Sequence, residues 1–173
     1  MKRLLTTSLG LAVLVGLALP LKAQHNPRGK TELTLKGKTV SIEYGRPSLH
    51  GRTITDMLGQ LKPGEFWRLG ADQSTTFVTG TALHFGGVTV PAGTYSLWAE
   101  KVSNNTWKLV FNKQHGQWGT QHNPKLDFAS VPLQEEKISD SAEMVTIELT
   151  RKGNGGEVSV HWGDLKLVTD FRA

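Results

Sequence analysis

The stretch YSLWAEKVSNNTWKLVFN, residues 95–112, contains the clearest β-hairpin pattern in the chain. Apolar side chains recur at every second position over residues 95–99 and again over residues 107–111, and Ser103-Asn104-Asn105 lies between the two runs. Alternation with a period of two is typical of a half-buried strand, and Ser and Asn favour tight turns. The stretch therefore predicts two antiparallel strands joined by a short turn.

The same pattern recurs on both sides of this hairpin. Further strands are expected at residues 40–44, 83–85, 88–90, 145–149, 158–162 and 165–168. A Gly pair separates the second and third of these, and a Gly-rich turn over residues 152–156 separates the fourth and fifth, as expected for hairpin connections.

Only residues 53–61 have a helical pattern. Ile54, Leu58 and Leu61 would share one helix face, and Lys62-Pro63-Gly64 would end the helix. Many short strands without alternating long helices favour an antiparallel sheet structure. The sequence therefore predicts an all-β protein, an antiparallel β-sandwich or flattened barrel of about ten short strands, with one short helix near residues 53–61.

The N-terminus has the pattern of a secretory signal peptide. Met1-Lys2-Arg3 is basic, residues 9–19 are almost uniformly apolar, and Leu21-Lys22-Ala23 ends in a small residue. We expect residues 1–23 to be a signal peptide that is cleaved after Ala23, which predicts a periplasmic or extracellular protein with no membrane span after cleavage. We expect residues 24–39 to form an N-terminal lead-in with a possible edge strand, and residues 40–173 to form a single β domain.

The charge balance gives little reason to expect a nucleic-acid ligand. The chain has 20 Lys and Arg, 15 Asp and Glu and no Cys, for a net charge of +5. Cleavage would remove Lys2, Arg3 and Lys22 and leave a net charge of +2. Nucleic-acid binding usually requires a concentrated basic surface, so no nucleic acid is expected as a partner. Without Cys, the chain can form no disulfide, Cys-based zinc site or iron-sulfur cluster.

Three arginines lie near aromatic residues and turn formers. Arg46 follows Tyr44-Gly45, Arg52 follows Gly51, and Arg68 follows Trp67. A guanidinium group pairs bidentately with a carboxylate or phosphate and stacks on aromatic faces, so these arginines could line a site for an anion or a sugar acid. In the structural alternative, Arg68 pairs with Asp72 inside the protein, while Arg46 and Arg52 cap loop carbonyls.

The tryptophans divide into two groups. Trp107 and Trp162 are in phase with apolar neighbours and are expected in the core, whereas Trp118 lies in a polar loop beside Gly119. An exposed Trp can stack on a sugar ring, although a loop Trp can equally fill the open end of a β-sandwich. The candidate ligand-binding residues are Arg46, Arg52, Trp67, Arg68, Asp72 and Trp118.

Metal and enzyme signatures are sparse. The histidines show no metal-binding spacing, so no metal and no cofactor are expected, although His115, His122 and Asp127 could converge across one loop. The chain contains no G-x-S-x-G, P-loop or G-x-G-x-x-G motif. Carboxylate pairs for glycoside hydrolysis could come from Glu43, Glu65, Asp72 and Glu100, which all lie in or beside strands.

Five motifs occur in an order that resembles a known family. They are Tyr44-Gly45-Arg46-Pro47 with Gly51-Arg52, residues 67–72 with Thr75, residues 90–97, Phe111-Asn112-Lys113 and Gln117-Trp118-Gly119. Over residues 40–150 the chain resembles the bacterial secreted family called domain of unknown function 2911. The resemblance implies an exported bacterial β domain and transfers no established activity. Asp72 and His122 stand where the resemblance implies Asn and Tyr more often.

Three functions are compatible with these observations. The first is a noncatalytic binding or accessory module for a small polar or carbohydrate-like ligand, or for a partner protein, near Arg46, Arg52, Trp67 and Arg68. The second is an exported hydrolase of saccharides that uses Asp72 or Glu43. The third is a structural envelope protein whose exposed edge strands pair with an envelope protein partner.

Overall fold

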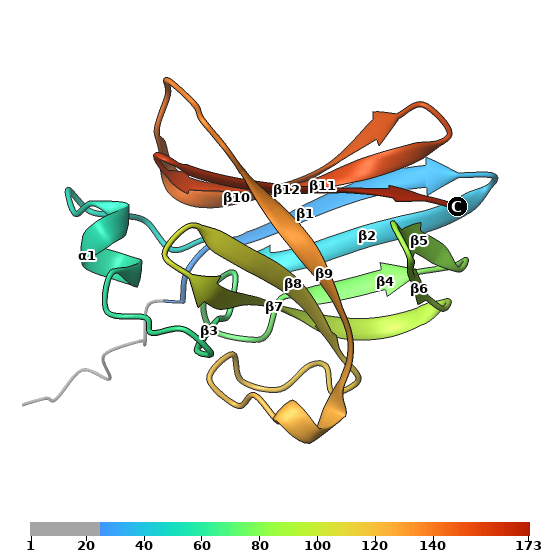
Figure 1. Cartoon of the computed structure of the whole chain (residues 1–173), viewed down its shortest axis with the longest axis horizontal. Helices are drawn as coiled ribbons and strands as arrows, with labels where there is room; N and C mark the ends of the chain where they lie inside the picture. The colour runs from blue at the N-terminus through green and yellow to red at the C-terminus, as the bar shows by residue number, and fades with distance from the viewer. Residues whose placement is uncertain (1–24) are drawn as a thin grey trace, which may run out of the picture.

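The structure is a computed structural model that describes residues 25–173, so the expected signal peptide lies outside the described residues. Its strands form a curled sheet, with one short α-helix at the end of the sheet away from the C-terminus (Figure 1). No helix among the described residues is long and apolar enough to span a membrane.

Twelve strands are joined in one antiparallel sheet. They are β1 (Arg28–Leu35), β2 (Lys38–Gly45), β3 (Phe66–Trp67), β4 (Thr76–Thr79), β5 (Leu83–Phe85), β6 (Val88–Val90), β7 (Gly93–Ser103), β8 (Thr106–Asn112), β9 (Asp127–Glu136), β10 (Ala142–Lys152), β11 (Gly155–Gly163) and β12 (Leu165–Arg172). The main path runs β1-β2-β4-β7-β8-β9-β12-β11-β10, while β3 pairs with β7, and β5 pairs with β6 and β12.

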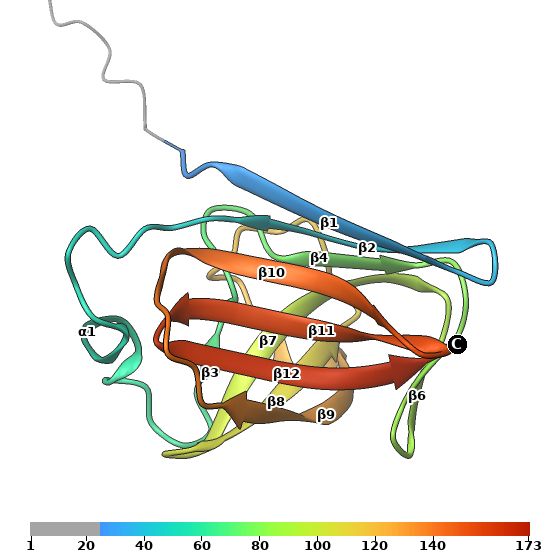
Figure 2. The ribbon, with the colours of Figure 1, turned by 90° about the horizontal axis from the view of Figure 1, so that it is seen from above.

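Strand β9 connects the two halves of the sheet. Most of its length pairs with β8, and its last residues, 134–136, pair with β12 instead. Figure 1 shows β9 crossing from one layer to the other, and Figure 2 shows β10, β11 and β12 side by side in the second layer. The sheet therefore curls into a nearly closed, flattened barrel, which confirms the predicted fold class with twelve strands instead of about ten.

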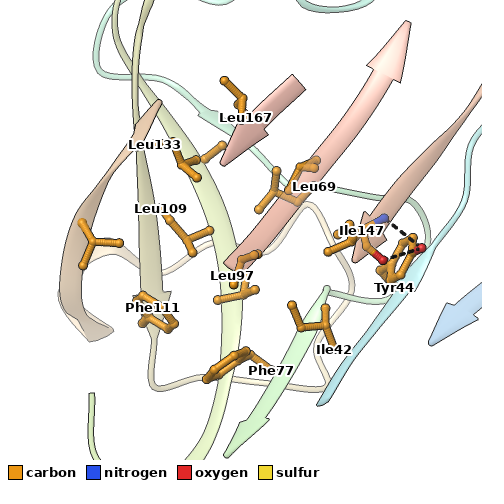
Figure 3. Close-up of a cluster of buried hydrophobic side chains, with 14 of the residues drawn as sticks. Ile42, Tyr44, Leu69, Phe77, Leu97, Leu109, Phe111, Leu133, Ile147 and Leu167 are labelled. Carbon is orange, nitrogen blue, oxygen red and sulfur yellow. Dashed lines mark hydrogen bonds between the residues drawn. The ribbon is translucent and has the colours of Figure 1, made fainter. Parts of the chain in front are cut away.

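The barrel closes through side chains where β2 approaches β10. The Tyr44 hydroxyl donates to the Ile147 carbonyl oxygen at 3.1 Å and accepts from the Ile147 N–H at 2.9 Å (Figure 3). The Leu149 N–H donates to the Thr31 hydroxyl at 3.0 Å. These bonds satisfy backbone N–H and C=O groups on the edge of β10. Without them, these groups would have no hydrogen-bond partner, because no neighbouring strand among the described residues pairs with this edge.

The segment after β2 continues this closure. The Val145 N–H donates to the Pro47 carbonyl at 3.1 Å, and the Leu49 N–H donates to the Glu143 carbonyl at 2.9 Å. We call the whole contact, formed by Thr31 and residues 44–49 against residues 143–149, the seam. It ties the first two strands of the chain to β10, more than 90 residues later in sequence.

Large apolar side chains fill the barrel. Ile42, Phe77, Leu97, Leu109 and Phe111 are almost completely buried and point into the interior (Figure 3). Phe111 packs edge-on against Phe77 at 5.4 Å between ring centroids. These residues occupy alternate positions of their strands, so the period of two in the sequence corresponds to the inner face of the barrel.

The only α-helix among the described residues, α1 (Ile54–Leu58), lies within the predicted helical segment. Thr53 caps its N-terminus: the Thr53 hydroxyl accepts from the Asp56 N–H at 3.2 Å, and the Asp56 carboxylate accepts from the Thr53 N–H at 2.7 Å. This capping box fixes the start of the helix. A short 3-10 helix, η1 (Pro124–Leu126), precedes β9.

Candidate functional site

A pocket of about 560 Å³ lies where α1, β3 and the loop between β8 and η1 meet. Its walls come from four segments of the chain: α1 with the turn after it, the segment 64–68 around β3, Trp98 of β7, and Gly119, Thr120 and His122 of the loop. We call it the aromatic pocket, because Phe66, Trp67, Trp98 and His122 all line it.

The apolar part of the aromatic pocket is firmly packed. Trp67 stacks on the core residue Trp162 with 5.8 Å between ring centroids. The indole N–H of Trp98 donates to the Ser96 hydroxyl at 2.9 Å, and the Gln117 side-chain amide donates to the same hydroxyl at 3.3 Å. The two tryptophans are therefore held in fixed orientations and form a rigid base for the pocket.

His122 is held from three sides. Its ring lies 4.5 Å from the Trp98 ring in a stacked arrangement and 4.3 Å from the Phe66 ring in a tilted one, measured between centroids. Its Nε2 lies 2.8 Å from the Asp127 carboxylate, which also accepts a 2.7 Å hydrogen bond from the buried Asn112. In the neutral ring, an Nε2–H that donates to Asp127 leaves Nδ1 as the acceptor, and Nδ1 makes no hydrogen bond with the described residues.

Arg68 is the cationic residue of the pocket lining. Its guanidinium makes no hydrogen bond or ion pair with any residue in 25–173. The side chain lies over Gly119, where an added Cβ would come within 3.2 Å of Arg68 Cδ and 2.7 Å of the Asp72 carbonyl oxygen. Because Gly119 has no side chain, the Arg68 side chain can pack against its backbone beside the pocket.

The other two candidate arginines lie elsewhere and bond to carbonyls. Arg46 donates from Nε to the Val145 carbonyl at 3.0 Å and from its guanidinium to the Thr146 hydroxyl at 3.1 Å, so it belongs to the seam. Arg52 donates from Nε to the Leu49 carbonyl at 2.9 Å. The structure therefore does not bring Arg46 and Arg52 together with Arg68.

Asp72 also lies outside the pocket lining. Its carboxylate accepts a 2.8 Å hydrogen bond from the Asn26 N–H, and no ion pair joins it to Arg68 within the described chain. Its carbonyl oxygen accepts from the Gly119 N–H at 2.7 Å, which joins the segment 67–72 to the Gln117-Trp118-Gly119 motif. Trp118 itself is 45% exposed and is not among the residues that line the pocket.

The four carboxylates considered for hydrolysis do not gather in the pocket, although Glu100 pairs in register with Phe66, next to Glu65. Glu43 pairs with Arg28 at 3.0 Å on the outer surface of the barrel, and Asp72 bonds to Asn26. Glu65 is the one carboxylate among the lining residues, and it accepts a 2.8 Å hydrogen bond from the Lys62 N–H. Across residues 25–173, no group of three His, Asp or Glu residues is placed to hold a metal ion.

Three of the four ring-bearing residues that line the pocket, Phe66, Trp98 and His122, are not among the candidate ligand-binding residues from the sequence. All residues from Tyr95 to Ala99 are buried, so both faces of β7 are covered here, one by the core and the other by the loop. A strand covered on both faces loses the polar alternation that distinguishes inside from outside.

The family model described as Protein of unknown function (DUF2911) matches residues 26–171, nearly the whole chain. The chain therefore belongs to this family, as its motifs indicated. No curated protein and no solved structure matches it.

Proposed function

We propose that this protein is an exported, noncatalytic binding module that holds a small polar or carbohydrate-like ligand in the aromatic pocket. The observation that carries the proposal is the position of Arg68: a cation without a protein partner among the described residues lines a pocket that has a rigid aromatic base. Small-molecule sites commonly combine an apolar lining with a few polar groups in a volume of about 300–1,000 Å³.

The remaining polar groups of the lining support the same conclusion. Thr120 offers a hydroxyl, Glu65 offers a carboxylate, and His122 offers Nδ1, which is an acceptor when the neutral ring carries its proton on Nε2. A sugar presents an apolar C–H face together with hydroxyl groups that need both donors and acceptors. The pocket supplies an apolar surface and these polar partners within one hollow.

The two other functions receive no comparable support. Asp72 and Glu43, which a hydrolase mechanism would have used, bond to Asn26 and Arg28 and do not line the pocket. The terminal strands of the sheet order, β1 and β10, approach each other at the seam, where side chains bond to backbone groups of the β10 edge. Edge pairing with an envelope protein would have to displace those bonds.

Blocking the pocket tests the proposal. Thr120 is exposed and lines the pocket, whereas Thr150 is exposed on β10 and lies outside it. Titration with a panel of neutral and acidic monosaccharides, followed by NMR, should shift the indole signal of Trp98 in the wild-type protein and in Thr150→Trp. Thr120→Trp should abolish those shifts. Equal shifts in Thr120→Trp, or no shift with any sugar in the wild type, would contradict a ligand site at this pocket.

Export is tested separately from binding. The signal-peptide pattern predicts that the mature chain begins at Gln24. Mass measurement of the protein recovered from a periplasmic extract or from the medium should give that N-terminus. Recovery of the full-length chain from the cytoplasmic fraction alone would contradict export and would leave the binding proposal intact.

A further inference from the structure

We infer that the ligand of the aromatic pocket is a ring that carries a carboxylate, of the hexuronic acid class, and that Arg68 binds this carboxylate. The inference rests on the proposed function of the pocket and adds the chemical class of the ligand. Four observations carry it: the guanidinium of Arg68 without a partner among residues 25–173, the charge balance of the lining, the polar groups of Glu65, Thr120 and His122 in the lining, and the apolar base.

Arg68 is suited to a planar anion. A guanidinium offers parallel N–H groups that match the two oxygens of a carboxylate, and such bidentate pairs are among the stronger hydrogen bonds in proteins. Arg46 and Arg52 use their N–H groups on carbonyl oxygens of their own chain, but Arg68 has no such partner within residues 25–173. The contact with Gly119 also restricts its side chain on one flank, which lowers the entropy lost when an anion binds.

The charges of the lining favour a single negative charge over a phosphate. Arg68 is the one permanent cation among the lining residues and Glu65 is the one carboxylate. The permanent charges of Arg68 and Glu65 cancel, so a bound carboxylate would leave one net negative charge in the pocket, whereas a phosphate monoester would leave close to two near Glu65. The lining therefore favours a monoanion over a dianion.

The other polar groups require hydroxyl donors on the same ligand. When its ring is neutral and carries the proton on Nε2, which donates to Asp127, His122 presents Nδ1 as an acceptor, and Trp98 and Phe66 pack on either side of the ring. A simple aliphatic or aromatic acid has no hydroxyl for this acceptor. A hexuronic acid has hydroxyl groups, one carboxylate and an apolar C–H face that can pack on Phe66.

Calorimetric titration with four probes tests the inference. We expect D-galacturonate to bind about tenfold or more tightly than D-galactose and than the methyl ester of galacturonate, since one charge-assisted pair is lost in each case. Benzoate, which has the carboxylate and a ring but no sugar hydroxyl, should bind more weakly than galacturonate. Arg68→Gln should remove the preference for galacturonate, while the matched variant Arg52→Gln, outside the pocket, should retain it.

The outcomes separate the inference from the proposed function. Equal affinity for galacturonate, its methyl ester and galactose would overturn the carboxylate assignment and leave a sugar-binding pocket. Benzoate binding as tightly as galacturonate would overturn the sugar class while keeping Arg68 as the anion contact. If none of the four probes binds, and if the Trp98 indole signal of Thr120→Trp responds to sugars in the same way as that of the wild type, both the inference and the proposed function would be overturned.

Discussion

The seam and the aromatic pocket use the same residue types in opposite ways. At the seam, Tyr44 and Arg46 direct their polar groups at backbone atoms of β10, and their hydrogen bonds complete the fold. At the pocket, Arg68 follows Trp67 in the sequence as Arg46 follows Tyr44-Gly45, yet its guanidinium has no partner among the described residues. An Arg beside an aromatic residue is therefore not by itself evidence for a site, because what the guanidinium contacts decides its role.

The two regions meet at Gly45, and breaking that contact should have the largest effect. A methyl group at Gly45 would collide with the Ala71 carbonyl, which belongs to the segment that carries Arg68. We expect Gly45→Ala to lower the free energy of unfolding by about 3 kcal/mol or more, because backbone atoms must move. Urea denaturation measures this loss.

Gly87→Ala is the matched control for this substitution. No atom lies within 4 Å of the position that its added Cβ would occupy. Its stability should stay within about 0.5 kcal/mol of the wild type, as for other surface changes. If Gly45→Ala were as stable as Gly87→Ala, the close contact between the two regions would not exist.

Removing one hydroxyl at the seam should have the next largest effect. Tyr44→Phe leaves the N–H and the carbonyl of Ile147 without their partner in a buried environment. Each unsatisfied buried group costs about 1–3 kcal/mol, so we expect a loss of about 2–4 kcal/mol in chemical denaturation. Tyr95→Phe, which removes a single hydrogen bond to the Pro91 carbonyl, should cost less. Equal losses in the two variants would contradict the seam as the closure of the barrel.

The two arginines give the sharpest form of the comparison. Arg46→Ala removes hydrogen bonds to Val145 and Thr146 and should cost about 1–2 kcal/mol of stability. Arg68→Ala removes no bond within the described chain and should change stability by about 0.5 kcal/mol or less while weakening ligand binding. Denaturation curves and sugar titrations of both variants check whether Arg46→Ala loses stability and Arg68→Ala loses ligand affinity. The reverse pattern would mean that Arg68 is the structural residue.

The smallest effect should come from acid titration at the seam. Hydrogen bonds from the Ser48 hydroxyl and the His50 N–H lower the pKa of Glu143 from its ordinary value of 4.5. A lowered pKa in the folded state means that the ionised group stabilises the protein above about pH 4.5, and that this contribution is lost as the pH falls through the folded value. The difference in stability between the wild type and Glu143→Gln should therefore be constant near neutral pH and shrink below pH 4.5.

Glu148→Gln serves as the control for this titration. Glu148 is exposed on the same strand and makes no hydrogen bond through its side chain with the described residues. The difference between the wild type and this variant should show no comparable decline in the same pH range. A similar decline would mean that general surface charge, and not the contacts of Ser48 and His50, produces the effect.

The sequence predicted the fold well because its signals are local. The strands over residues 40–44 and 145–149 alternate between fully buried and less buried positions, since one face of each packs on the core. The short helix was predicted from a local pattern as well, but it ends at Leu58 with Gly59 as its C-cap, before the expected stop at Lys62-Pro63-Gly64. Strand pairs such as β9 with β12, in contrast, depend on contacts that no local pattern specifies.

The lining of the candidate pocket could be predicted only in part. Trp67 and Arg68 line the pocket as neighbours in one motif, but the partner of each candidate Arg could not be derived from spacing, because Val145 lies 99 residues from Arg46. Phe66 and His122 were not among the candidate ligand-binding residues, since the side chains of a loop or of a two-residue strand have no periodicity that shows which of them turn inward.

NMR of the arginine Nε–H groups tests the central claim most directly. In the protein without ligand, the Nε–H of Arg46 should exchange slowly with water because it is bonded to the Val145 carbonyl, and the Nε–H of Arg68 should exchange fast. Addition of galacturonate should slow exchange at Arg68 and leave Arg46 unchanged. Slow exchange at Arg68 before any ligand is added, or no change at Arg68 with galacturonate, would contradict the division between a structural and a ligand-binding arginine.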